Sequence, residues 1–444
     1  MLKIYNTLLH QVEEFRPQND SKVLMYTCGP TVYDHMHIGN LRTFVFSDIL
    51  VRSLKLNGFS VESVENITDI DDKIIKRAKE QEKSLNQISE EFTKYFLEDV
   101  QKLNILVPTH QPKATEYISQ MADYIKTLID KGFAYREQDG SVYFDISKFD
   151  DYGRLSGLDK RELKTGTRLL SDEYTKDDVQ DFALWKAVPE GETGSYKTDL
   201  GWGRPGWHIE CSVMSQTLLG EKIDIHAGGI DLVFPHHENE IAQSEAKTGE
   251  KPFVRYWVHG AHMLVDGKKM SKSLNNFYTL SDLEKKGFDP LALRYLYLQT
   301  HYRQEMNFTW EALEAAQNAL DKLRKEIVSY DEPRVGCAAL EQEFLEAVND
   351  DLNMPKALAI LWKVVNSDYP SSAKAESILK FDKVLGLSLE ISKEILKSRE
   401  KKMPEDVKEL LLKREKLRKE KKYDEADKIR EQIIEMGFRV EDKD

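Results

Sequence analysis

The chain has 444 residues, of which 40% are hydrophobic and 32% are charged. This length suits two to four domains with buried cores, and the composition excludes an intrinsically disordered chain. There is no run of 18 apolar residues, and the first ten residues lack the apolar stretch of a signal peptide. We therefore expect a cytoplasmic protein without a membrane segment.

The three cysteines, Cys28, Cys211 and Cys337, lie far apart in the sequence. Such a sparse, odd set is not a disulfide framework, so each is expected to be a free thiol or a metal ligand. The net charge of −13 hides an asymmetry, because residues 393–430 hold 15 Lys and Arg against 10 Asp and Glu. This basic segment is a candidate RNA-binding arm, and a solvated helical hairpin of mixed charge is the alternative.

The N-terminal pattern predicts a strand, a turn, a helix and a second strand. Residues 23–27 are an apolar run that ends at Cys28-Gly-Pro, and apolar residues recur at helical spacing from about Ile38 to Leu56. Asn57-Gly58 suits a helix end, and residues 60–67 are predicted to form the second strand. This order is typical of an α/β domain with a Rossmann-like parallel sheet.

Further along, helices are predicted over about 72–103 and 113–131, and a hairpin over 133–146 around Asp139-Gly140. A polar stretch follows this hairpin. With the hairpin and the helix before it, this stretch is predicted to form a connective insertion over 105–200, which separates two halves of the catalytic domain, 1–104 and 201–245. The second half is predicted to contain a helix over 207–219, a strand over 223–225 and a helix from about Pro235. Beyond residue 310 the patterns are helical. They predict a bundle over 311–392 and a helical hairpin within 393–444, with helices over about 405–420 and 424–436.

A possible phosphate site lies where the first strand meets the first helix, at His37-Ile-Gly39-Asn40. Free backbone N–H groups and the positive end of a helix dipole meet at such a turn. Gly39 lets a ligand approach the backbone, while His37 and Asn40 can donate hydrogen bonds to phosphate oxygens. An ordinary helix start with a polar cap is the alternative.

A second candidate is the loop-like segment Asp266-Gly-Lys-Lys-Met-Ser-Lys-Ser-Leu-Asn-Asn276. Lys269 and Lys272 are three residues apart with Ser271 between them. Two such lysines suit a loop that closes over a polyphosphate and neutralises the charge that develops as pyrophosphate leaves. A solvent-exposed basic loop is the alternative.

Four residues suit a zinc site. His236 and Glu240 are four apart and share a face if the segment after Pro235 is helical. Cys28 follows the first strand, and Cys211 lies near the start of the helix from Trp207. Two thiolates, one imidazole and one carboxylate are a sound zinc set. Spacing alone does not establish the site, and two buried cysteines with a charged helix end are the alternative.

The His37-Ile-Gly-Asn string, placed well before Lys-Met-Ser-Lys-Ser, resembles the class I aminoacyl-tRNA synthetases. Asn40 departs from the second histidine often found there, but it can still donate a hydrogen bond. Four further strings are similar to the cysteinyl-tRNA synthetase family. They are Cys28-Gly-Pro-Thr-Val-Tyr-Asp, Asn66-Ile-Thr-Asp-Ile-Asp-Asp-Lys-Ile, Arg204-Pro-Gly-Trp-His-Ile-Glu-Cys and Phe234-Pro-His-His-Glu-Asn-Glu-Ile-Ala-Gln-Ser.

This resemblance implies that L-cysteine reacts with ATP and Mg²⁺ to form cysteinyl-adenylate, and that the cysteine then passes to the 3′ end of tRNA(Cys). It implies a lysine-loop and tRNA-stem-contact region over 246–310 and an anticodon-binding hairpin over 393–444, and we expect a monomer. The residues it implicates are His37, Asn40, Lys269 and Lys272 in catalysis; His37, Gly39, Asn40, Asp231 and Lys272 in ATP binding; Thr68, Trp207 and His226 in cysteine binding; and Cys28, Cys211, His236 and Glu240 as ligands of one Zn²⁺ per chain.

Zinc explains how such a site separates cysteine from serine. A hydrogen-bonding pocket separates the two poorly, whereas a soft thiolate binds zinc well and a hydroxyl does not. The sequence indicates no editing domain. The alternatives are an ATP-dependent cysteine:amino-sugar ligase of mycothiol synthesis, which the basic hairpin disfavours, a zinc hydrolase, which leaves the lysine segment unexplained, and an inactive binding protein. A secondary persulfide-forming activity with pyridoxal phosphate is a further alternative.

Overall fold

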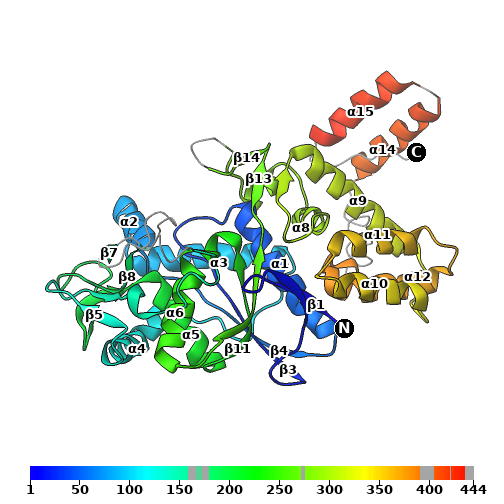
Figure 1. The fold of residues 1–444 in the computed structure, drawn as a ribbon. Helices are drawn as coiled ribbons and strands as arrows, with labels where there is room; N and C mark the ends of the chain where they lie inside the picture. Colours follow the sequence, from blue (N-terminus) through cyan, green and yellow to red (C-terminus); the bar gives the residue numbers. More distant parts are fainter. Residues whose placement is uncertain are drawn as a thin grey trace. The chain divides into compact units, whose positions relative to one another are not determined.

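The computed structural model describes residues 1–158, 168–169, 172, 180–271, 276–390, 405–420 and 422–435. The chain forms two compact units, Met1–Leu387 and Ser388–Asp444, both drawn in Figure 1. In the described part of the chain, no helix has both the length and the apolar character needed to span a membrane.

The first unit is built around a parallel four-stranded sheet with the strand order β12–β11–β3–β4. Its strands are β3 (Lys22–Thr27), β4 (Ser60–Glu65), β11 (Ile223–Gly229) and β12 (Val254–Gly260). Helix α1 (Ile38–Leu56) packs against one face of the sheet, and α5 (Trp207–Leu219) and α6 (His236–Thr248) lie on the other (Figure 1). The predicted Rossmann-like fold is confirmed.

Helix α1 has the predicted bounds because its sequence carries both end signals. Its buried side includes Leu41, Val45 and Leu50, which recur at helical spacing. The backbone N–H of Asn57 caps the last turn, and Gly58 follows with φ +87°. Glycine adopts this left-handed conformation readily, so the chain turns directly into β4.

The helix predicted over 72–103 is in fact two helices, α2 (Asp72–Gln81) and α3 (Leu85–Lys102). Glu82 ends α2 in a left-handed conformation, with φ +53°. Ser84 then begins α3, because its side chain accepts a hydrogen bond from the N–H of Gln87 while the Gln87 side chain accepts one from Ser84 N–H. The Ser-x-x-Gln pattern of this capping box was the sequence signal for the break.

The insertion contains α4 (Ile118–Asp130) and a sheet with the order β5–β6–β8–β10–β9, to which β7 adds beside β8. The predicted hairpin around Asp139-Gly140 joins β5 to β6, and Gly140 takes φ +96°. Because β10 belongs to this sheet, the sheet extends past residue 200. Its strands are β5 (Ala134–Arg136), β6 (Val142–Phe144), β7 (Arg168–Leu169), β8 (Asp181–Ala187), β9 (Tyr196–Thr198) and β10 (Gly201–Pro205).

Two smaller sheets complete the strands described. The N-terminal pair is β1 (Lys3–Asn6) with β2 (Gln11–Glu14), and the other sheet joins β13 (Met263–Val265) to β14 (Lys268–Lys269) and β15 (Met306–Phe308). The helices of this region are α7 (Leu280–Lys285) and α8 (Pro290–Leu298), followed by α9 (Trp310–Ser329), α10 (Ala338–Asn349), α11 (Met354–Val365) and α12 (Ser371–Leu385).

The second unit contains α14 (Glu405–Lys419) and α15 (Tyr423–Glu435), which pack against each other. Their small core consists of Val407, Ile429 and Ile433. These helices lie where the sequence predicts the final hairpin.

Candidate active site and metal centre

A cavity of about 270 Å³ lies beyond the C-terminal ends of β3 and β11. Open α/β sheets bind their ligands at this edge, where loops after neighbouring strands converge. The residues of its lining that the sequence analysis singled out are Cys28, His37, Asn40, Trp207 and Asp231.

His37 caps helix α1 with its own side chain. Its Nδ1 accepts a hydrogen bond from the backbone N–H of Asn40 at 3.0 Å. Burial lowers the pKa of His37 to about 4, so the ring is neutral at pH 7. Because Nδ1 is the acceptor, the ring proton lies on Nε2, which is the atom left to donate a hydrogen bond to a ligand.

The lysine segment lies against the start of α1. The N–H of Ile38 donates to the carbonyl of Tyr278 at 2.9 Å, and a Cβ added to Gly39 would lie 3.3 Å from Cε of Met270. Lys269 is exposed in β14, so the segment begins as a strand pair, where the sequence indicated only a loop. Lys272 lies outside the described residues.

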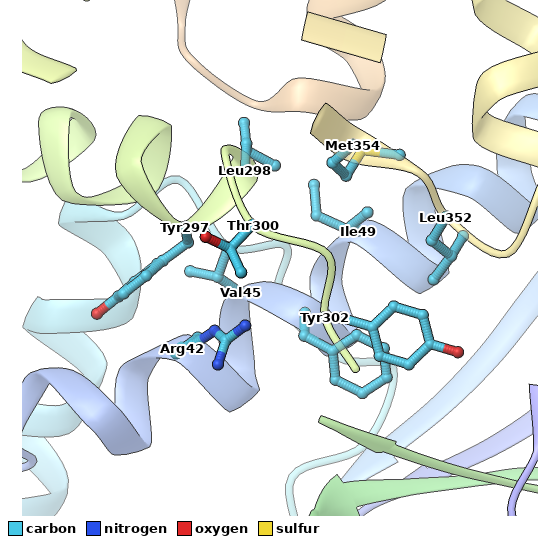
Figure 2. Close-up of a pocket in the computed structure, with 10 residues that line it drawn as sticks. Arg42, Val45, Ile49, Tyr297, Leu298, Thr300, Tyr302, Leu352 and Met354 are labelled. Carbon is cyan, nitrogen blue, oxygen red and sulfur yellow. The ribbon is translucent and has the colours of Figure 1, made fainter. Parts of the chain in front are cut away.

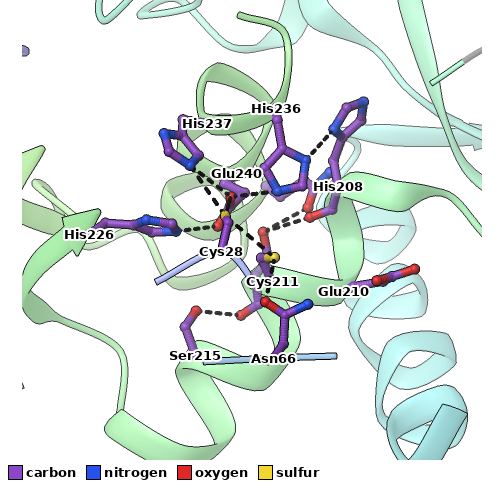
Figure 3. A network of polar contacts seen from close by, with 12 residues as sticks. Cys28, Asn66, His208, Glu210, Cys211, Ser215, His226, His236, His237 and Glu240 are labelled. Carbon is purple, nitrogen blue, oxygen red and sulfur yellow. Dashed lines mark hydrogen bonds and ion pairs between the residues drawn. The ribbon is translucent and has the colours of Figure 1, made fainter. Parts of the chain in front are cut away.

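The four predicted zinc ligands lie together (Figure 3). The Sγ atoms of Cys28 and Cys211 are 3.8 Å apart, and the Cys28 sulfur is also 3.8 Å from Oε1 of Glu240. One turn apart on α6, His236 Nε2 and Glu240 Oε1 are 3.1 Å apart. All four side chains are buried. The strand end, α5 and α6 thus each contribute to one compact donor set.

This donor set fits a zinc ion. In a tetrahedral site with Zn–S bonds of about 2.3 Å, two thiolate sulfurs lie about 3.8 Å apart. His236 Nε2 is buried and faces Glu240 Oε1 at 3.1 Å, so an imidazole nitrogen and a carboxylate oxygen converge here. Zinc takes both atom types as ligands, so one ion can bind them together with the two sulfurs.

The electrostatics of the cluster favour the charged, metal-binding forms of two predicted ligands, Cys211 and Glu240. Burial raises the pKa of Cys211, but the hydrogen bond with Cys28 and the charge on His236 outweigh it and bring that pKa to about 6. Burial also acts to raise the pKa of Glu240, yet the charges of His226 and His236 lower it to about 2. The pKa of Cys28 is instead raised, by burial and then by its hydrogen bond with Cys211. One thiolate and one carboxylate are therefore present at pH 7, and zinc binds both forms.

Two further histidines complete a second possible donor set, which shares Cys28 and Glu240. His226 Nε2 lies 3.0 Å from Glu240 Oε2, and His237 Nε2 lies 3.3 Å from the Cys28 sulfur. His226, which we expected in the cysteine pocket, thus contacts the carboxylate of a predicted metal ligand.

His237 is a further member of the cluster for which the sequence predicts no role. Its Nδ1 lies 2.7 Å from Nε2 of His259, whose Nδ1 contacts the Thr7 hydroxyl at 2.7 Å. Helical spacing paired Glu240 with the histidine four residues before it, and no spacing rule links His237 to His259. The signal that could have found His237 was its i,i+3 spacing to Glu240, whose Oε1 lies 4.0 Å from His237 Nε2.

Thr68 lies in a buried polar chain next to the donor set. Its hydroxyl donates to Glu210 Oε2 at 2.8 Å and accepts from Asn66 Nδ2 at 3.1 Å. The Asn66 side-chain oxygen accepts the N–H of Gly29 at 2.9 Å. Asn66, which sequence reasoning also left without a role, therefore ties the turn after Cys28 to Thr68.

The family models match most of the chain. Residues 14–318 match the model described as the tRNA synthetases class I (C) catalytic domain, and residues 400–444 match the cysteinyl-tRNA ligase anticodon binding domain. Among solved structures, the fold is similar to methionyl-tRNA synthetase of Mycobacterium tuberculosis, with a TM-score of 0.59 and 14% identity over 84% of this chain and 92% of that one. It is also similar to the leucyl-tRNA synthetase (LeuRS) of Agrobacterium radiobacter K84, with a TM-score of 0.60 and 12% identity over 86% of both chains.

Curated relatives are similar over nearly their whole length. The cysteine–tRNA ligase of Chlamydia muridarum is 47% identical over 99% of this chain and 98% of its own. That of Leptospira interrogans serovar copenhageni is 44% identical over 99% of this chain and 97% of its own.

The start of helix α1 and the lysine segment meet at the C-terminal edge of the parallel sheet. This arrangement, with the matched catalytic model, defines a class I aminoacyl-tRNA synthetase. Both the catalytic and the anticodon-binding models are matched, and the relatives align from end to end. The chain belongs to the cysteine–tRNA ligase family.

Proposed function

We propose that this protein activates L-cysteine with ATP and transfers it to the 3′ end of tRNA(Cys). The observation that carries the proposal is the position of Cys28. It belongs to the buried donor set and also lines the cavity that contains His37 and Asn40. A thiol-binding metal site and a phosphate-binding helix start therefore open into one cavity, as the joining of cysteine to ATP requires.

At the phosphate end, the chain supplies hydrogen-bond donors and positive charge. His37 Nε2–H and the Asn40 amide are placed to donate to phosphate oxygens of ATP, which binds with Mg²⁺. Lys269 and Lys272 neutralise the charge that develops as pyrophosphate leaves. Gly39 keeps the backbone open to the nucleotide, and Asp231, which also lines the cavity, is proposed to face the adenylate.

At the other end, Cys28, Cys211, His236 and Glu240 would hold one zinc ion. When bound, zinc supplies a coordination position that favours the substrate thiolate over the serine hydroxyl. Trp207 lies over His236, with ring centroids 4.2 Å apart, and lines the cavity, so we assign it to the wall of the cysteine pocket. Thr68 is held by Asn66 and Glu210, and His226 holds the Glu240 carboxylate.

The helical hairpin of the second unit is proposed to recognise tRNA. The family model for anticodon binding matches residues 400–444, which overlap the Lys- and Arg-rich segment at 393–430. Basic side chains on such a hairpin provide the phosphate contacts that tRNA binding requires. We further propose that the protein acts as a monomer in the cytoplasm.

Aminoacylation of purified tRNA tests the function directly. We expect the protein to attach radiolabelled cysteine to a tRNA with a GCA anticodon, and to leave a matched tRNA with a different anticodon uncharged. Ligation of cysteine to an amino sugar, without charging of either tRNA, would refute the proposal and establish the alternative ligase.

A further inference from the structure

Arg42, on helix α1, uses its guanidinium to hold four backbone carbonyls. Its Nη1 donates to the carbonyl oxygens of Ala261 at 2.9 Å and His262 at 2.8 Å. Its Nη2 donates to those of His301 at 3.2 Å and Gln304 at 2.8 Å. The side chain is buried, and among the described residues no carboxylate forms an ion pair with it. All of its hydrogen-bond partners here are main-chain atoms.

The four carbonyls belong to the two segments that support the β13–β14 hairpin, residues 263–269, which we call the lysine hairpin. Residues 261–262 connect β12 to β13, and residues 301–304 lie between α8 and β15. Strand β13 pairs with β15 on one side and on the other with β14, which ends at Lys269. Arg42 therefore ties both supports of this hairpin to the helix whose first turn contains Gly39 and Asn40.

Neighbouring residues also hold the start of α1 in place beside Arg42. Figure 2 shows Arg42 and Tyr297 among the residues that line a small cavity between α1 and the segment after α8. The Tyr297 hydroxyl donates to the carbonyl of Ile38, in the first turn of α1. Burial lowers the pKa of Arg42 to about 10, so the side chain remains a cation at pH 7. A planar cation with five N–H donors can bridge two segments in a way that a lysine cannot.

We infer that Arg42 is a positioning residue for adenylate formation, which holds the lysine hairpin at its working distance from the phosphate site. The inference rests on the proposed function of Lys269 and His37. A displacement of about 1 Å in a group that stabilises a transition state costs about 100-fold in rate. Loss of the four carbonyl contacts therefore lowers the rate of the chemical step and leaves the cysteine end of the cavity unchanged.

The test is cysteine-dependent exchange of pyrophosphate into ATP, measured without tRNA for Arg42→Lys and Arg42→Met. The matched control is Arg52→Lys, on the same helix. Arg52 is also buried, and it donates to the carbonyls of Lys383 and Asn104 and to the Asp48 carboxylate. None of these acceptors lies in the two segments that support the lysine hairpin. Metal content and thermal unfolding are recorded for each protein, so that a folding defect is recognised.

We expect both Arg42 variants to lose about 10- to 100-fold in kcat, with the KM for cysteine and the zinc content within about twofold of the parent protein. Arg52→Lys should keep its kcat. If one Arg42 variant does not fold, the other decides. Full kcat in a folded Arg42 variant would overturn the inference, as would an equal loss of kcat in Arg52→Lys. Absence of exchange in the parent protein would instead refute the proposed function.

Discussion

The sulfur atoms of Cys28 and Cys211 lie 3.8 Å apart although 183 residues separate them in the sequence. This separation is the one that two thiolates adopt on a tetrahedral zinc ion. It arises because β3 lies next to β11 in the sheet and α5 packs against β3. The parallel sheet thus brings together two cysteines that no local sequence pattern connects.

Replacement of Cys211 by serine tests the donor set. We expect Cys211→Ser to lose stoichiometric zinc, because a hydroxyl is a poor ligand, and to raise the KM for cysteine at least tenfold. The matched control is Cys337→Ser, which alters a buried cysteine outside the donor set. Zinc can be measured by atomic absorption. Full zinc content in Cys211→Ser would refute the ligand assignment.

Gly29→Ala tests whether the turn after Cys28 must stay where it is. A Cβ on Gly29 would lie 1.6 Å from the carbonyl oxygen of Asn66, so the turn has to move. We expect this variant to lose both zinc and cysteine activation. Gly58→Ala is the control, because its Cβ would meet no atom within 4 Å and its positive φ costs only about 1 kcal/mol. A zinc-replete, active Gly29→Ala protein would show that the Asn66 contact is dispensable.

The buried His37 predicts a pH dependence of stability. Its folded pKa of about 4 lies below its ordinary value of 6.5, so the unfolded chain binds the proton more tightly. Stability from this group is therefore complete above pH 6.5 and falls as the pH is lowered toward 4, by on the order of 2 kcal/mol. His37→Asn keeps a helix cap but cannot titrate.

Thermal unfolding of both proteins at pH 7.5 and pH 4.5 measures this difference. The fall in Tm between the two pH values should be smaller in His37→Asn than in the parent protein. An equal or larger fall in the variant would exclude a depressed pKa for His37.

Lys272→Ala tests the role of the lysine segment in adenylate formation. We expect pyrophosphate exchange to slow by about 100-fold, because charge on the leaving group is no longer neutralised, while the KM for cysteine stays within about twofold. Lys268→Ala removes an exposed lysine from β14 and should leave exchange nearly unchanged. An equal effect of the two substitutions would assign the segment only a general electrostatic role.

Local signals predicted the elements that hold the site. The bounds of α1 followed from its apolar spacing and its Asn57-Gly58 end, the bounds of α5 were also predicted, and the start of α6 followed from Pro235. The break between α2 and α3 was missed because apolar spacing alone does not reveal Glu82 in a left-handed conformation. Lys269 forms a strand because it pairs with Leu264 across a turn. The basic composition around Lys269 indicated a loop, so the strand was not predicted.

Local sequence patterns predicted less of the metal centre than of the fold. Helix periodicity links His236 to Glu240, and family resemblance supplied Cys28 and Cys211. The contacts of His237 with Cys28 and His259 depend on how α6 packs against the sheet, which no spacing rule predicts. The four carbonyls that Arg42 binds come from segments more than 200 positions away, and backbone carbonyls leave no trace in a sequence.

The central claim is that the donor set selects cysteine by its thiol, and exchange of pyrophosphate with ATP tests it most directly. The zinc-loaded protein should support exchange with cysteine and, at the same concentration, at least about 1,000-fold less with serine, as expected for a site built around a bond that serine cannot make. Removal of zinc with a chelator should abolish exchange with cysteine. Comparable exchange with serine, or full exchange with cysteine after zinc removal, would contradict the account.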